Sequence, residues 1–336
     1  MRWHIPLLLG ALLQLPPETA LSEEASAVSH GPIELRDQHP LSLLHTTFRP
    51  QDASILAIGS ARLGANLSLS NTLNYKADGF RVDTETRVSD LFLRYGLVPG
   101  LEIQISQNVI WRGSGESDEF IAAFHKAFQF EQAKSELVPE DEYKIGGVNN
   151  DGTTFQLDRD GFGLSGLETS IKYSPSDQTA EERWAVLFGV ALPTGTSEFG
   201  QDGLDLQLAF YGQAGFGDLD FYSGAALIYY TDTEINNLEF PSFQYAGFLG
   251  VRAPINPEFA LYLGGHLASI LLDDVNGYPD YQTYVDLGVR TRVTNRLVLD
   301  TALRENVLHS QGTTDITLMI GLTYSLGDEG QVIKTT

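Results

Sequence analysis

Large apolar residues alternate with small or polar residues along most of the chain after residue 60. In DITLMIGLTYSL, residues 315–326, every second residue from Ile316 to Leu326 is large and apolar, and those between are small, polar or flexible. Successive side chains of a β-strand point to opposite faces, so this period of two predicts strands. The pattern predicts twelve of them, over residues 60–75, 81–97, 101–112, 161–174, 183–193, 204–216, 219–231, 242–254, 258–272, 281–293, 296–308 and 314–326.

The predicted connectors alternate in length. Short ones such as 98–100 alternate with long polar ones such as 193–203. Short turns at one end and long loops at the other are typical of outer-membrane barrels. We therefore predict an all-β fold, a transmembrane antiparallel up-and-down β-barrel of about twelve strands over residues 58–327. A further hairpin at 142–158 is expected to stand above the membrane, and fourteen strands is the alternative if it enters.

The difference between the apolar and the charged faces of the strands indicates which medium surrounds the barrel. Twelve apolar faces cannot all meet a soluble core when the opposite faces carry many charges, so the apolar faces are expected to meet lipid. The spacing Gly321-x-x-Tyr324-x-Leu326 resembles the C-terminal signal that the barrel insertion machinery recognises. The expected partners are therefore membrane lipid, lipopolysaccharide and the barrel insertion machinery. The chain continues past Leu326, and residues 328–336 are expected to form a C-terminal tail.

The N-terminal residues are typical of an exported protein. The apolar run at 5–15 is too short to span a bilayer, and Ala27 ends an A-x-A motif. We predict a cleaved signal peptide at 1–27, with a cut after Ala20 as the alternative, and an outer-membrane location in a Gram-negative bacterium. The net charge of −23 disfavours nucleic acid as a partner, and the chain has no cysteine, hence no disulfide.

Residues 28–57 precede the first predicted strand and combine prolines, a short apolar run and a polar set. A segment on the periplasmic side can fold up into a barrel as a plug. The alternative is a disordered periplasmic leader. The plug candidates are Arg36, Asp37, Gln38 and Pro40.

The inward faces of the predicted strands carry charges of both signs. A barrel of twelve strands lies between those that side chains fill and those that hold an aqueous channel. The charges either line a narrow pore or pair across the lumen and hold the barrel's shape. Arg290, Arg292 and Arg304 on adjacent strands suggest a selectivity patch, which Asp286 and Asp300 could neutralise. The lumen candidates are Arg62, Arg94, Glu102, Glu168, Lys172, Asp205, Arg252, His266, Asp286, Arg290, Arg292, Asp300 and Arg304.

One helix is expected within the long extracellular loop at 113–160. Over residues 117–132, phenylalanines recur every four residues, which places them on one stripe of a helix. This helix could narrow the barrel mouth, lie on the outer leaflet or pack on the hairpin at 142–158. The candidate constriction residues are Phe120, Phe124, His125 and Phe128.

Signs of an active site are weak. His266 and Ser269 lie three apart in a predicted strand, which puts them on opposite faces, and no Cys/His spacing predicts a metal site. We therefore expect no enzyme activity, no metal and no cofactor, and keep an outer-membrane enzyme as a remote alternative.

Three motifs carry a resemblance to a family. They are GPIELRDQHPL at 31–41, DEFIAAFHKAF at 118–128 and DGFGLSGLETSIKY at 160–173, the last with Ser165-Gly166 where the family usually has Gly-Asp. Together they resemble an uncharacterised proteobacterial family, domain of unknown function 3187, from about residue 31 to the end. The resemblance implies an outer-membrane barrel and no particular activity.

Two functional hypotheses from different classes remain. The first is a narrow channel or transporter for a small, unidentified solute, plugged by residues 28–57 and narrowed by the 117–132 helix. The second is a closed structural or interaction barrel whose large outer loop contacts lipopolysaccharide or a partner protein.

Overall fold

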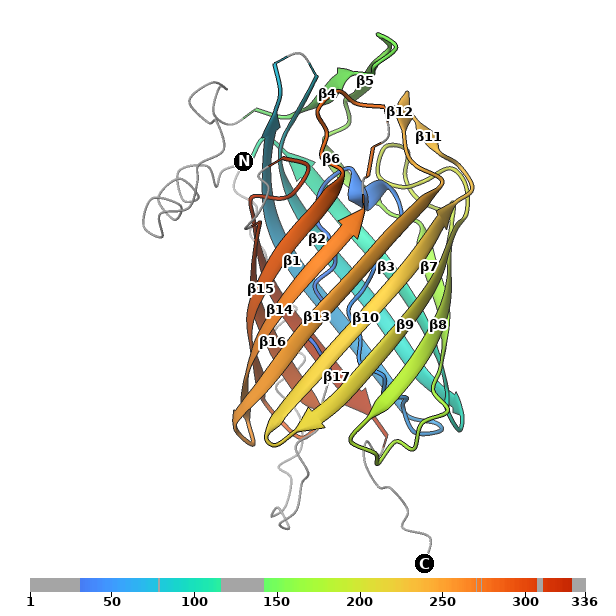
Figure 1. The fold of residues 1–336 in the computed structure, drawn as a ribbon, viewed down its shortest axis with the longest axis vertical. Helices are drawn as coiled ribbons and strands as arrows, with labels where there is room; N and C mark the ends of the chain where they lie inside the picture. Colours follow the sequence, from blue (N-terminus) through green and yellow to red (C-terminus); the bar gives the residue numbers. More distant parts are fainter. Residues whose placement is uncertain are drawn as a thin grey trace, which may run out of the picture.

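The computed structural model describes residues 31–77, 79–115, 142–269, 271–272, 274–306 and 311–327. Their strands form a closed antiparallel barrel of twelve wall strands (Figure 1). The wall consists of β1 (Ala61–Tyr75), β2 (Phe80–Val98), β3 (Leu101–Gly113), β6 (Gly161–Leu164) followed by β7 (Leu167–Tyr173), β8 (Arg183–Leu192), β9 (Asp205–Phe216), β10 (Leu219–Tyr230), β13 (Phe243–Asn256), β14 (Phe259–Ser269), β15 (Tyr281–Arg292), β16 (Leu297–Glu305) and β17 (Ile316–Leu326).

The first and last wall strands close the ring. β1 pairs with β17 from Ala61 opposite Leu326 to Asn71 opposite Ile316, and it pairs with β2 on its other edge. Closure gives the backbone polar groups of these edges partners that lipid cannot supply. By the usual orientation of such barrels, the end with the short turns and both wall termini is called the periplasmic end here, and the other the outer end.

The count of twelve follows from the position of the predicted hairpin. β4 (Lys144–Val148) and β5 (Thr154–Leu157) pair with each other, and β4 pairs with the outer end of β2 at Phe80–Asp83. Because β3 pairs directly with β6 and β7, the hairpin is not inserted into the ring. The predicted strand at 161–174 is divided at Ser165-Gly166.

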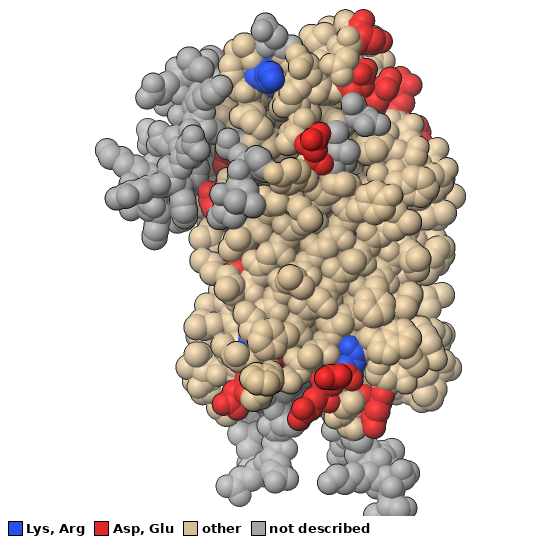
Figure 2. Space-filling model, viewed as in Figure 1, with Lys and Arg blue, Asp and Glu red and all other residues tan. Residues whose placement is uncertain are grey.

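The two faces of the wall differ as the alternation predicts. On β1, Leu63 and Leu67 are exposed, whereas Asn66 and Ser68 are buried inside. Figure 2 shows charged side chains gathered toward the two ends of the visible face, with a broad uncharged band between them. This band is the surface expected to contact lipid.

An extended segment, residues 31–57, lies inside the barrel and is called the interior segment below. Its beginning contacts Arg290 near the periplasmic end of β15, and its turn includes the short helix η1 (Ser42–Leu44) near the outer end (Figure 1). The chain then descends, and the backbone N–H of Leu56 donates to Glu102 near the periplasmic end of β3. The segment therefore runs up the lumen and back down before it enters β1.

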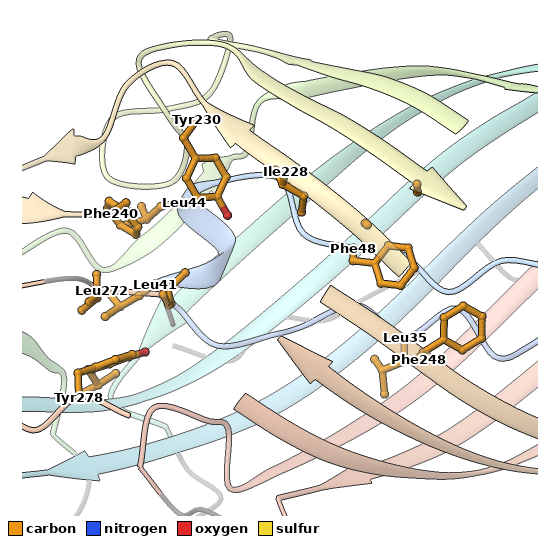
Figure 3. Close-up of a cluster of buried hydrophobic side chains, with 14 of the residues drawn as sticks. Leu35, Leu41, Leu44, Phe48, Ile228, Tyr230, Phe240, Phe248, Leu272 and Tyr278 are labelled. Atoms are coloured by element: carbon orange, nitrogen blue, oxygen red, sulfur yellow. The ribbon is translucent and has the colours of Figure 1, made fainter. Parts of the chain in front are cut away.

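Apolar residues of the outer loops pack over the turn of the interior segment. The loop strands β11 (Glu234–Ile235) and β12 (Leu238–Glu239) belong to this layer. Figure 3 shows Leu41 and Leu44 of the segment among residues of the wall and loops, including Tyr230, Phe240, Leu272 and Tyr278. Burial of these side chains stabilises the fold by about 1.5–3 kcal/mol for each large apolar residue.

Several predicted segments lie outside the described residues. They are the signal peptide at 1–27, the helix at 117–132 with Phe120, Phe124, His125 and Phe128, and the tail at 328–336. Within the described part of the chain, no helix is long and apolar enough to cross a membrane.

Candidate functional site

The interior segment binds the barrel wall through charged side chains at several levels. Arg36 donates from Nη1 to Glu168 Oε2 at 2.8 Å, and Thr46 donates to Glu168 Oε1 at 2.8 Å. Arg36 also donates from Nε to Thr47 Oγ1 at 3.0 Å, which ties the ascending arm of the segment to the descending arm. The carboxylate of Glu168 on β7 therefore holds both arms.

Arg304 on β16 joins wall and segment from the opposite side. Its Nε donates to Asp286 Oδ1 at 2.7 Å, while Nη1 and Nη2 donate to the backbone carbonyls of Arg36 at 2.9 Å and Leu35 at 2.8 Å. Nε2 of His266 lies 2.7 Å from the other carboxylate oxygen of Asp286. Arg304 is buried, so these contacts replace the water that its guanidinium would otherwise bind.

Arg290 on β15 repeats this arrangement toward the periplasmic end. Its Nε donates to Asp300 Oδ1 at 2.7 Å, and Nη2 donates to the carbonyl of Pro32 at 3.2 Å. Asp286 and Asp300 thus lie against two members of the predicted arginine patch, and both arginines also bind backbone carbonyls of the segment. The third member, Arg292, is half-buried near the end of β15.

Charges that the segment itself contributes bind the wall across the lumen. Arg49 donates to Asp90 on β2 at 2.8 Å. Glu34 accepts from Arg94 Nη2 at 2.5 Å and lies 3.6 Å from Arg49. Burial raises the pKa of Glu34, but the charges of Arg94 and Arg49 more than offset burial and hold that pKa below its ordinary value.

Lys172 on β7 is bound near the periplasmic end. Its Nζ lies 3.4 Å from Glu102 and 3.7 Å from Asp52 of the segment. The turn at the outer end is held by His45, whose Nδ1 lies 3.1 Å from Asp205 and whose ring stacks on Tyr230 with a centroid separation of 4.0 Å.

His39 is buried at the outer end with both ring nitrogens engaged. Its Nε2 lies 3.1 Å from Asn74 Oδ1, and the N–H of Leu41 donates to Nδ1 at 3.3 Å. Burial lowers the pKa of His39 from 6.5 to about 4, although Asp37 opposes that shift. The neutral ring is therefore the form that this site holds.

The remaining predicted residues fall into two groups. Asp37 accepts from Tyr284 at 2.9 Å, Gln38 accepts from Ser68 at 2.9 Å, and the carbonyl of Pro40 accepts from Arg112 at 2.8 Å. These contacts link the predicted plug residues to the wall. By contrast, Arg252 forms an ion pair within the wall, with Asp220 of the neighbouring strand. Arg62 is buried and faces inward on β1.

Several wall-binding residues of the segment were not among the predicted site residues: Glu34, Arg49, Asp52 and His45. Their spacing has no helical or strand period, because an extended irregular chain presents side chains wherever the wall supplies partners. The only available signal was an unusual density of charge and histidine in a short region rich in proline.

Two small cavities lie between the interior segment and the wall. One of about 30 Å³ lies among Asp37, His266, Tyr284 and Arg304, and another of about 20 Å³ lies beside Glu168. Such volumes suit single water molecules. Among the described residues, no group of three or more His, Asp or Glu side chains could hold a metal ion.

A closed barrel with an uncharged outer band and a charged, filled interior defines this protein as an outer-membrane β-barrel. The chain belongs to the family described as "Protein of unknown function (DUF3187)", whose sequence profile matches residues 15–326. No curated protein matches the sequence.

Solved structures share the fold. The COG4313 outer membrane channel from Pseudomonas putida F1 is 13% identical, with a TM-score of 0.57, and the match covers 82% of this chain and 99% of that one. The NanC porin is 9% identical, with a TM-score of 0.45, and the match covers 79% of this chain and 100% of that one. The first similarity shows that the barrel has the fold of an outer-membrane channel.

Proposed function

We propose that the protein is a narrow channel for small polar solutes, and that the interior segment is a displaceable plug. The observation that carries this proposal is the use of wall charges to bind the segment. Glu168 and Asp205 accept hydrogen bonds from it, and Arg304 donates hydrogen bonds to it. Removal of the segment would leave a lumen lined by charges of both signs, which is the lining of a solute pore.

The wall can remain intact when the segment leaves. β1 pairs directly with β17 from Ala61 to Asn71, so the ring of backbone hydrogen bonds does not pass through residues 31–57. The segment is held instead by charged hydrogen bonds, each of which contributes about 1.5–3 kcal/mol. A closed resting state with rare openings follows from this balance.

A single cysteine tests the displacement in the intact protein, which has no native cysteine. Ala53 is fully buried in the segment, whereas Ile58, just beyond it, is 62% exposed. In a planar bilayer, a thiol reagent should modify Ala53→Cys only during open intervals and should modify Ile58→Cys at all times. If the channel conducts while the cysteine of Ala53→Cys stays unmodified by the thiol reagent, the segment is not displaced in the open state.

Acid is expected to weaken closure through His39. The pKa of about 4 in the closed state lies below the ordinary 6.5, so a released ring binds a proton that the plugged form excludes. Closure is strongest above pH 6.5, weakens as the pH falls, and has lost this contribution at about pH 4, a change of about 3 kcal/mol. Among the groups around it, Asp37 favours the proton and Arg112 opposes it.

Open time measured against pH checks this expectation. In His39→Gln, a neutral amide can replace the hydrogen bond to Asn74, and the rise in open time between pH 6.5 and 4 should disappear. Glu34 is a poor alternative source of the rise, because Arg94 and Arg49 keep its pKa below the ordinary value. If the variant keeps the pH profile of the parent protein, His39 is not the group that makes open time depend on pH.

A second candidate function is a closed interaction barrel. The apolar packing of Leu44, Phe240 and Leu272 over the segment's turn favours it, because a permanent cap needs such a layer. In that case lipopolysaccharide or a partner protein would bind the outer loop at 113–160. Absence of conductance from folded protein, with and without the segment, would support this function over the channel.

A further inference from the structure

A groove of about 990 Å³ lies on the lipid-facing surface of β8 to β15, outside the lumen. One end lies at Ser176 and Asp177, in the periplasmic turn after β7. The other end lies at Gly265 and Val285, midway along β14 and β15. The groove therefore runs from the periplasmic interface toward the middle of the membrane.

Small residues form much of its floor. Gly212, Ser223 and Gly265 occupy outward positions in one row of paired residues, and the exposed side chain of Leu249 lies between Ser223 and Gly265 in that row. Trp184 and Phe210 form one wall and stack with a centroid separation of 5.9 Å and an interplanar angle of 20°. This shape accommodates one extended apolar chain, whose contact with the aromatic rings adds dispersion energy.

The periplasmic end of the groove carries two carboxylates. Asp177 and Glu182 line it, and both side chains are exposed. Arg183 lies on the other face of the wall, because it pairs with Gln213, which is buried and accepts a hydrogen bond from Ser54 of the interior segment. An ammonium group suits the two carboxylates.

We propose that this groove binds one glycerophospholipid of the periplasmic leaflet whose head group carries an ammonium group. The ammonium group lies beside Asp177 and Glu182, and one acyl chain extends over Gly212 and Ser223 toward Gly265. A lipid of that leaflet has its charged group at the interface and its chain ends at the bilayer centre, which is the polarity of the groove. This site is independent of the channel proposal, since it lies outside the wall.

Trp184 supplies a probe within the groove. The sequence has three tryptophans, and in a chain of residues 28–336 the substitution Trp111→Phe leaves Trp184 alone. Vesicles of phosphatidylethanolamine and phosphatidylglycerol would carry brominated chains on one lipid at a time, at equal mole fraction. Quenching of Trp184 should show a preference of about fivefold for the ethanolamine lipid, which corresponds to about 1 kcal/mol.

Matched variants distinguish quenching by a lipid bound in the groove from quenching by the surrounding bilayer. A Cβ at Gly265 would meet nothing nearer than 3.9 Å, so Gly265→Leu fills the groove without disturbing the wall and should abolish the preference. Ala65→Leu adds apolar bulk on the lipid face of β1 and should leave it unchanged. Glu182→Gln should reduce the preference for the ethanolamine lipid. In Trp184→Phe, Trp111 is the remaining tryptophan, and both brominated lipids should quench it equally.

Two results would overturn the proposal. The first is equal quenching of Trp184 by the two brominated lipids. The second is a dimer in detergent that Gly265→Leu dissociates, since this would assign the groove to a second copy of the chain.

Discussion

Deletion of residues 31–57 is expected to convert a mostly silent barrel into a continuously conducting one. In the channel proposed above, the contacts of Arg36, Arg49 and His45 with the wall hold the closed state, and the variant has none of these contacts. If they favour closure by about 3 kcal/mol or more, the time-averaged current should rise by at least about a hundredfold. Planar-bilayer recordings of the refolded chain with and without the segment measure this directly.

The deletion must leave the barrel folded for the result to count. Heat-modifiable gel mobility reports the closed ring, which β1 and β17 form without the segment. Ion selectivity of the open form should then depend on lumen charges that the segment no longer covers, so Glu168→Gln should shift the selectivity toward anions. A folded deletion variant that stays silent would contradict the channel and favour the closed interaction barrel.

Replacement of Arg304 by leucine should produce the second largest effect. It leaves the buried carboxylate of Asp286 without its guanidinium, and it leaves the carbonyls of Leu35 and Arg36 without donors. Loss of one partner from a buried ion pair costs about 3–5 kcal/mol. Displacement of the segment lets water reach Asp286 and relieves much of that cost, so Arg304→Leu should increase open probability by more than about a hundredfold.

Arg252→Leu is the matched control. Arg252 also faces inward and is buried, but its ion pair joins Asp220 of the neighbouring wall strand and not the segment. Its loss should lower the temperature of barrel unfolding while open probability stays near that of the parent protein. Equal increases in open probability from both variants would mean that the segment responds to general loss of stability and not to its own contacts.

The barrel could be predicted from the sequence because the alternation that identifies each strand lies within a short stretch of the chain. Each wall strand alternates between lipid and lumen, so residues such as Leu63 and Leu67 report their own environment without knowledge of any partner. The predicted strand boundaries fall within a few residues of those found, and the break at Ser165-Gly166 is the main departure within the described wall. Inward charges such as Glu168 and Arg304 could be identified for the same reason.

The partners that those charges find in the interior segment could not be predicted in this way. Arg36 and Glu168 are separated by 132 positions, and the two meet only because the closed ring brings β7 and the segment to the same level. For Arg290 and Arg304 the sequence offered Asp286 and Asp300 as possible counterions, and the register assigns Asp300 to Arg290 and Asp286 to Arg304. The sequence by itself determined the barrel, its lipid-facing surface and the sign of each lumen residue. Only the tertiary structure decided that the interior segment occupies the lumen, because that depends on contacts between residues far apart in the chain.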